Sequence, residues 1–162
     1  MAAPGSTRLV ADQVKVGDAL PELAYDVSAT TVVLGALASR DWRPMHHDYD
    51  FAVNRNGVRN IFLNTPNQAL WFERYVTDWT GPRGRIGRVK FKMMDSVFPG
   101  DRMVFRGVVS GVDTDAAGCC WASLDVSLRV GDKTMTTCAV RVAIPSHRED
   151  NPWKRAGADW RP

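Results

Sequence analysis

Hydrophobic and polar residues alternate along four stretches in the second half of the chain. In the first stretch, Val89, Phe91 and Met93 are separated by basic residues. The same period of two runs through three longer stretches, at residues 102–112, 120–130 and 133–144. Such alternation is typical of half-buried β-strands. The short polar segments DTDAAG and GDK connect these three longer stretches. Such short connections predict that the neighbouring strands pair in antiparallel orientation.

The first half of the chain opens with a short alternating segment and continues with a helical period. Alternation in residues 23–27 predicts an early strand. Residues 29–40 then place apolar side chains at helical spacing behind Ser28, which is suited to cap the helix. We expect Pro44 to end this helix, because proline cannot continue a helix and pushes the preceding residue into extended geometry.

Two further helices are predicted before the strands. A short helix covers residues 49–56 behind Asp48 as its N-cap. A longer helix covers residues 66–80, with Thr65 expected at the N-cap and Gln68 completing a capping box. Apolar residues cover most of the circumference of the longer helix, so we expect the rest of the fold to enclose it.

These elements predict an α+β fold in which a curved antiparallel sheet wraps around a long central helix. We divide the chain into a flexible lead-in at residues 1–15, one domain at residues 16–145 and a charged tail at residues 146–162. The tail holds Trp153 and Trp160, which are costly to leave in water. We therefore expect the tail to lie along a neighbouring subunit.

Composition narrows the class of protein. With 162 residues and 44% hydrophobic content, the chain can bury one sizeable core. A net charge of +3 without a long basic block argues against nucleic-acid binding. The absence of a signal-peptide pattern and of an apolar run of about 18 residues predicts a soluble, cytoplasmic protein that does not span a membrane. The three cysteines are an odd number in apolar segments and are expected to be reduced core thiols.

The segment RDWRPMHHD is the main candidate for chemistry, because Asp41 and His46 flank a proline-broken turn in it. A bend allows side chains five residues apart to converge, whereas a continuous helix separates them around its axis. A carboxylate and an imidazole that converge in an apolar cavity can hold a water molecule and exchange protons with it near neutral pH. Addition of water to a double bond needs such a pair. A metal site that includes His47 and a polar helix junction without chemistry are the alternatives.

The start of the long helix is the candidate for the second half of such a site. Addition of water to an α,β-unsaturated thioester builds negative charge on the thioester oxygen, and N–H groups at a helix N-terminus can stabilise that charge. Because Pro66 has no N–H, the amide of Thr65 is the expected donor, with help from Asn64.

Two motifs resemble those of the MaoC-like, or R-specific, enoyl-CoA hydratases, which have the hot-dog fold. The family signature reads Asp, any residue, Asn, Pro, any residue, His, any residue, Asp, and it is matched by Asp41, Pro44, His46 and Asp48. The segment VKFKMMDSVFPGD is similar to a strand of that family followed by its Val-x-Pro-Gly-Asp turn, at Val97, Pro99, Gly100 and Asp101. The resemblance covers roughly residues 17–145. It implies hydration of a trans-2-enoyl-CoA thioester to a 3-hydroxyacyl-CoA, with Asp41 and His46 as the catalytic pair.

The sequence departs from the family pattern at two places. Arg43 stands at the signature Asn, and Asn64 and Thr65 replace the usual His-Gly pair at the start of the long helix. The segments ALASRD, HHDYDFAV, NIFLN and ERYVTDWTGP are similar to one branch, the small MaoC-like subunit of bacterial steroid side-chain enoyl-CoA hydratases.

The resemblance to this branch implies the catalytic subunit of a heteromer, as a dimer or a dimer of heterodimers. The implied partner is a second MaoC-like chain with a zinc-ribbon and OB-fold extension that binds acyl-CoA. The implied substrate is a polycyclic acyl-CoA. The resemblance also implies no bound metal in this chain and no cofactor, with coenzyme A present only as part of the substrate.

Basic residues are candidates for contacts with the substrate. Arg43 could be a surface charge, pair with Asp41 or reach a phosphate or carbonyl of the substrate. A second group could meet the phosphates of coenzyme A or form a solvated strand face, namely Arg83, Arg85, Arg88 and Lys90. Two other functions suit the same fold: a non-catalytic subunit that completes a partner's acyl-CoA tunnel, and thioester hydrolysis.

Overall fold

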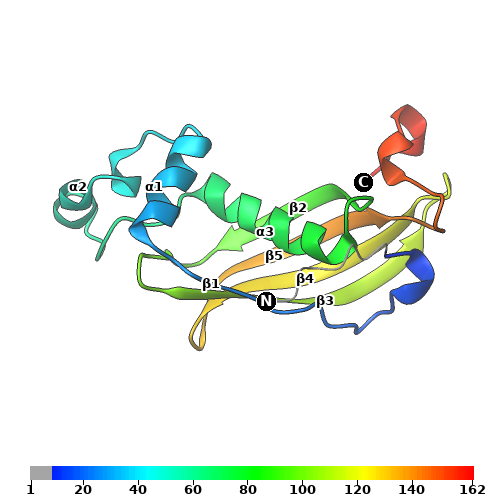
Figure 1. The fold of residues 1–162 in the computed structure, drawn as a ribbon, viewed down its shortest axis with the longest axis horizontal. Helices are drawn as coiled ribbons and strands as arrows, with labels where there is room; N and C mark the ends of the chain where they lie inside the picture. Colours follow the sequence, from blue (N-terminus) through cyan, green and yellow to red (C-terminus); the bar gives the residue numbers. More distant parts are fainter. Residues whose placement is uncertain (1–8) are drawn as a thin grey trace.

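The computed structural model describes residues 9–162, whose strands form one antiparallel sheet (Figure 1). The strands are β1 (Leu23–Asp26), β2 (Arg85–Met93), β3 (Arg102–Thr114), β4 (Cys120–Val130) and β5 (Lys133–Ile144). Their spatial order is β1-β3-β4-β5-β2, and each neighbouring pair is antiparallel, as predicted. The lead-in predicted at residues 1–15 falls partly on residues 1–8, which lie outside the described residues.

Three α-helices accompany the sheet within residues 9–162: α1 (Ala29–Ala38), α2 (Tyr49–Asn54) and α3 (Thr65–Thr80). α3 runs along one face of the sheet, whereas α1 and α2 lie at one end of it (Figure 1). The predicted α+β arrangement, an antiparallel sheet with a long helix packed on it, is therefore observed.

α3 packs on the sheet through one face only. Phe72, Tyr75 and Val76 on this face are buried, and the Phe72 ring meets Phe105 of β3 edge to face with centroids 5.1 Å apart. On the opposite face, Leu70 is 51% exposed. The expectation that the fold encloses this helix was therefore wrong for this chain, because a single sheet covers only one side of a helix.

The N-terminus of α3 differs from the prediction by one residue. Asn64, not Thr65, caps the helix, because the Asn64 side-chain oxygen accepts a hydrogen bond from the Asn67 N–H at 3.3 Å. The predicted capping box is not formed, since Gln68 is fully buried and accepts a hydrogen bond from Thr136 Oγ1 at 2.8 Å. Both Asn and Thr are suitable caps, so contacts from elsewhere in the fold decided between them.

The C-terminus of α1 also differs from the prediction. The helix ends at Ala38, well ahead of Pro44, and Arg40 adopts a left-handed conformation with φ 54°. The Asp41 N–H then donates to the Ala36 carbonyl at 2.9 Å, which closes the last turn. The prediction that Pro44 ends this helix was therefore wrong, and the turn at Arg40 instead brings Asp41 into place.

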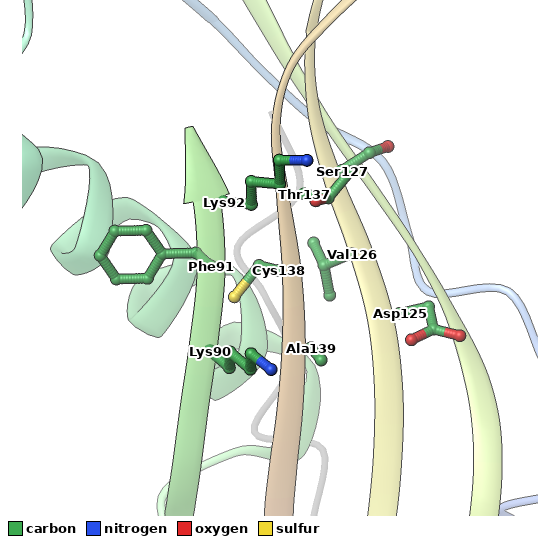
Figure 2. A pocket seen from close by; sticks show the side chains of 9 residues that line it. All are labelled: Lys90, Phe91, Lys92, Asp125, Val126, Ser127, Thr137, Cys138 and Ala139. Carbon is green, nitrogen blue, oxygen red and sulfur yellow. The ribbon is translucent and has the colours of Figure 1, made fainter. Parts of the chain in front are cut away.

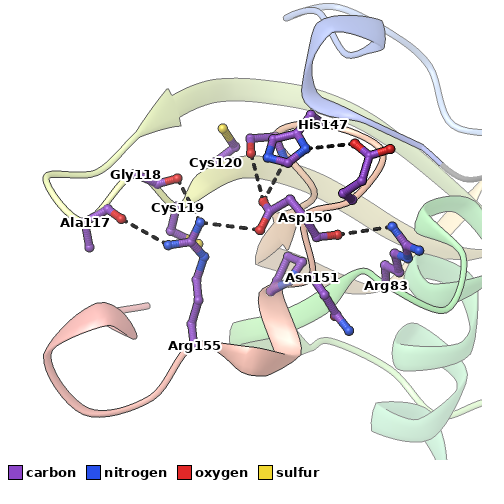
Figure 3. A network of polar contacts seen from close by, with 12 residues as sticks. Arg83, Ala117, Gly118, Cys119, Cys120, His147, Asp150, Asn151 and Arg155 are labelled. Atoms are coloured by element: carbon purple, nitrogen blue, oxygen red, sulfur yellow. Dashed lines mark hydrogen bonds and ion pairs between the residues drawn. The ribbon is translucent and has the colours of Figure 1, made fainter.

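The C-terminal tail folds back onto the end of the sheet that lies opposite α1 and α2 (Figure 1). The Arg85 guanidinium lies 3.6 Å from the ring centroid of Trp160, and Trp160 packs on buried Trp121 of β4 with ring centroids 5.0 Å apart. Arg155 donates to two carbonyls of the β3–β4 turn, each at 3.0 Å, and pairs with Asp150 (Figure 3). These contacts place the tail on its own sheet, where the sequence had suggested a neighbouring subunit.

Replacing Trp160 by Ala is expected to lower the free energy of unfolding by about 1–2 kcal/mol, because Trp121 loses an aromatic neighbour and Arg85 loses a cation–π partner. Urea denaturation measures this loss. Trp153→Ala is the control, with a smaller expected effect because the Trp153 side chain is 59% exposed. A Trp160 variant as stable as the wild type would show that the tail adds nothing to stability.

Candidate active site

Asp41 and His46 converge across the bend that the sequence predicts. Asp41 follows α1, and His46 ends a one-turn 3₁₀ helix, Pro44–His46. Asp41 Oδ2 lies 3.5 Å from His46 Nε2, and the two side chains are only 7% and 4% exposed. The carboxylate and the imidazole therefore form a close and nearly buried pair.

A backbone carbonyl orients the His46 ring. His46 Nδ1 lies 2.9 Å from the carbonyl oxygen of Phe62, and the two rings pack edge to face with centroids 4.9 Å apart. Because a carbonyl oxygen only accepts hydrogen bonds, Nδ1 carries the hydrogen of the neutral imidazole. Nε2 then presents its lone pair toward Asp41.

The turn at residues 97–101 supports the segment that carries the Phe62 carbonyl. The neighbouring Leu63 N–H donates to the first carbonyl of the turn at 2.9 Å. Asp101 accepts a hydrogen bond from the backbone of the turn at 2.8 Å, and Gly100 has φ 90°, a conformation that favours glycine. The Val-x-Pro-Gly-Asp motif thus acts on the site indirectly, through the carbonyl that orients the imidazole.

Arginine and asparagine side chains surround the Asp41 carboxylate. Arg43 donates from Nε to Oδ1 at 2.9 Å and from Nη2 to Oδ2 at 3.2 Å. Asn64 Nδ2 donates to Oδ2 at 3.0 Å. The Arg43 guanidinium holds the pKa of Asp41 well below its usual range; burial opposes this effect, and the Asn64 hydrogen bond adds to it. Of the roles that the sequence left open for Arg43, the structure shows the pairing with Asp41.

Asn64 connects Asp41 to both neighbouring helices. Its Nδ2 also donates to Ser39 Oγ at 2.8 Å, and Ser39 in turn donates to the Gly35 carbonyl of α1 at 2.7 Å. The Asn64 side chain is therefore occupied in holding the carboxylate and capping α3, two contacts that sequence reasoning missed. Among the described residues, none accepts a hydrogen bond from the Thr65 N–H, which remains the predicted donor to a thioester oxygen.

Two substitutions of Asn64 are expected to separate its two contacts. Asn64→Ala removes both the cap and the donor to Asp41, and is expected to cost about 1–2 kcal/mol of unfolding free energy across the pH range where Asp41 is ionised. Asn64→Asp keeps the cap but sets two carboxylates side by side, which raises the pKa of one of them. The Asp variant is therefore expected to be destabilised at pH 7 and to regain stability as the pH falls to about 4 and that carboxylate takes up a proton. Urea denaturation at both pH values measures this, and identical pH dependence of the two variants would contradict it.

Three of the arginines that were candidates for contacts with coenzyme A instead hold the C-terminal tail. Arg85 and Arg88 donate to carbonyls of the tail at 2.8 and 2.7 Å, and Arg83 donates to a third carbonyl at 3.3 Å. These arginines follow the far end of α3, whose 16 residues rise about 24 Å from Asn64. Their role in holding the tail was not evident from the sequence.

Lys90 lines a pocket of about 640 Å³ formed by β2, β4 and β5. Figure 2 shows this pocket with Lys90 and Lys92 on β2, where Phe91 points toward α3. Asp41 and His46 are not among the residues that line it. The pocket is therefore separate from the carboxylate–imidazole pair, and a contact of Lys90 with coenzyme A stays a prediction.

Two other polar residues of the RDWRPMHHD segment, His47 and Asp48, do not take part in the Asp41–His46 pair. His47 is exposed, and Asp48 caps α2 by accepting a hydrogen bond from the backbone N–H of Phe51 at 3.0 Å. Within residues 9–162, no group of three or more His, Cys, Asp or Glu side chains is placed to hold a metal ion.

The three cysteines are free and buried, and burial raises the pKa of the Cys138 thiol to about 12. In the part of the chain that the structure describes, every helix is too short or too polar to cross a membrane.

The fold and the pair together define a class of protein, the hot-dog fold with a carboxylate–imidazole pair beside the start of its central helix. The beta subunit of 3-oxo-4,17-pregnadiene-20-carboxyl-CoA hydratase from Mycobacterium tuberculosis is 38% identical over 98 residues, which are 60% of this chain and 75% of the relative. No protein-family model matches the chain. At this identity and coverage, the chain belongs to the MaoC-like hydratase family.

Solved structures agree with this assignment. The chain resembles a chain of the ChsH1–ChsH2 complex from Mycobacterium tuberculosis with a TM-score of 0.74 and 32% identity, covering 80% of this chain and 98% of that one. It resembles the (R)-hydratase from A. caviae with a TM-score of 0.74 and 21% identity, covering 83% and 100% of the two chains. The second comparison shows a shared fold.

Proposed function

We propose that this chain is the catalytic subunit of an enoyl-CoA hydratase, which adds water to a trans-2-enoyl-CoA thioester and forms a 3-hydroxyacyl-CoA. The observation that carries the proposal is the pair of Asp41 Oδ2 and His46 Nε2, 3.5 Å apart and nearly buried. A water molecule that donates its two hydrogens to these acceptors has its oxygen lone pairs free to attack the β-carbon. The Thr65 N–H at the start of α3 is suited to stabilise the negative charge that develops on the thioester oxygen.

The substrate in this proposal is a steroid side-chain enoyl-CoA, and the partner is a second MaoC-like chain with a zinc-ribbon and OB-fold extension that binds acyl-CoA. The support is the name of the relative, a beta subunit of a pregnadiene-carboxyl-CoA hydratase, and the resemblance to a two-component complex. Apolar side chains exposed on α1 and α3 offer surface for such a partner: Leu34 at 58%, Leu37 at 45% and Leu70 at 51%. The proposed location is the cytoplasm, and coenzyme A enters only as part of the substrate.

The test is to purify the chain alone and together with the partner and to follow the absorbance of the conjugated enoyl thioester. The expected result is loss of this absorbance and a product with the mass of the substrate plus one water. Release of free coenzyme A would identify a thioesterase instead. Full activity of the complex after loss of the Asp41–His46 pair in this chain alone would identify a non-catalytic subunit.

A further inference from the structure

Arg43 occupies the signature position at which the family has Asn, and it forms a two-point contact with the Asp41 carboxylate. Nε and Nη2 reach different oxygens of Asp41, at 2.9 and 3.2 Å. The planar guanidinium matches a carboxylate in this way, and an amide of Asn cannot reproduce both the geometry and the charge. The Arg43 side chain is 65% exposed whereas that of Asp41 is 7% exposed, so a solvated cation orients a nearly buried anion.

Asp41 and His46 differ in how many hydrogen bonds their acceptor atoms already receive. A carboxylate offers about four lone-pair sites, and Asp41 accepts two hydrogen bonds from the Arg43 side chain, one from the Arg43 backbone N–H at 3.5 Å and one from Asn64. The Nε2 lone pair of His46 faces Asp41 Oδ2, and the Nδ1 contact with the Phe62 carbonyl keeps the hydrogen on the other nitrogen. A proton released between the two groups therefore meets one acceptor that is already hydrogen-bonded and one that is free.

We propose that Arg43 is a positioning residue that, together with Asn64, makes His46 the proton acceptor in hydration, while Asp41 remains an anion that orients the water and stabilises the imidazolium. The proposal rests on the proposed hydratase function. The titratable and charged groups that face Asp41 are Arg43 and His46.

The proposed step balances in protons and electrons. The water O–H bond breaks as its proton moves to His46 Nε2, and the oxygen forms a bond to the β-carbon of the enoyl thioester. The electron pair of the double bond moves to the α-carbon and the thioester oxygen as an enolate, which the Thr65 N–H is placed to stabilise. The Nε2 proton then moves to the α-carbon, and the neutral imidazole is restored.

The test replaces Arg43 in the complex by Asn, which is the signature residue, and by Lys, which keeps the charge without the planar fork. Arg43→Asn is expected to lower kcat about 10- to 100-fold with KM within about twofold, because the carboxylate and its water lose their fixed geometry. Loss of the guanidinium charge beside Asp41 favours protonation of the Asp41–His46 pair, so the acid limb of the pH–rate profile is expected to move to higher pH. Arg43→Lys keeps the positive charge but not the two-point contact with Asp41. Its acid limb is therefore expected to lie closer to that of the wild type than its kcat does.

Arg55→Asn, an exposed arginine at the end of α2, is the matched control and should change neither kcat nor the profile. Circular dichroism and urea denaturation check that each variant is folded. An increase in KM at unchanged kcat would overturn the proposal, because it would place Arg43 against the substrate. Unchanged kinetics and an unchanged profile would also overturn it. Both outcomes require an active wild-type complex, whereas a wild-type complex that hydrates no enoyl-CoA overturns the proposed function itself.

Discussion

Replacing His46 by Ala in this chain alone is expected to lower kcat of hydration by the complex about 10²–10⁴-fold, with the assembly intact. In the proposed function the imidazole takes the proton of the water, and the other nitrogens that contact Asp41 Oδ2 among the described residues, Arg43 Nη2 and Asn64 Nδ2, are hydrogen-bond donors that cannot replace it. Asp41→Asn keeps the shape of the side chain but removes its charge. It is expected to cause a comparable loss, because the amide no longer stabilises an imidazolium and its NH₂ group can face Nε2.

Enoyl-CoA turnover of each complex and its size in gel filtration measure these effects together. His47→Ala is the matched control, since His47 is the next residue in the sequence and is exposed. It is expected to keep turnover within about twofold of the wild type, within the range of surface substitutions. Near-normal rates in both the His46 and the Asp41 variants would contradict catalysis by this chain and favour the non-catalytic role.

Replacing Phe105 by Ala is expected to lower the free energy of unfolding by about 3–5 kcal/mol. Phe105 is fully buried where β3 meets α3, and its ring lies 5.1 Å from Phe72 and 5.7 Å from Tyr75, between centroids. The truncation removes apolar burial and leaves a cavity under α3, and a backbone held by strand pairing cannot collapse fully to fill it.

Urea denaturation followed by circular dichroism measures the Phe105 effect. Val108→Ala on the same strand is the control, because Val108 is 38% exposed and points away from the core. Its expected loss is about 1 kcal/mol or less. If the two substitutions cost the same, the interface between α3 and the sheet is not the main source of stability.

Two segments of the chain meet at the candidate site. The bend after α1 supplies Asp41 and His46, and the segment before α3 supplies the Phe62 carbonyl and the Asn64 side chain. Because Asn64 at the start of α3 contacts Asp41, the core beneath α3 supports the geometry of the Asp41–His46 pair. A destabilised core is therefore expected to reduce turnover even when the pair is unchanged.

The sequence by itself determined the elements and the identity of the pair. Period-two alternation predicted β2 to β5, and Ser28 and Asp48 cap α1 and α2 as predicted, because strand faces and caps depend on residues within a few positions of each other. The convergence of Asp41 and His46 was predicted for the same reason, since both lie on one short bend around Pro44.

The tertiary structure decided which neighbours hold that pair. The contact between His46 and the Phe62 carbonyl spans 16 residues, and the contact between Asn64 and Asp41 spans 23 residues. No local period encodes such contacts, because they exist only once α1, α3 and the turn at residues 97–101 are packed together. For the same reason, the sequence left several roles open for Arg43, and only the folded chain shows its guanidinium on both oxygens of Asp41.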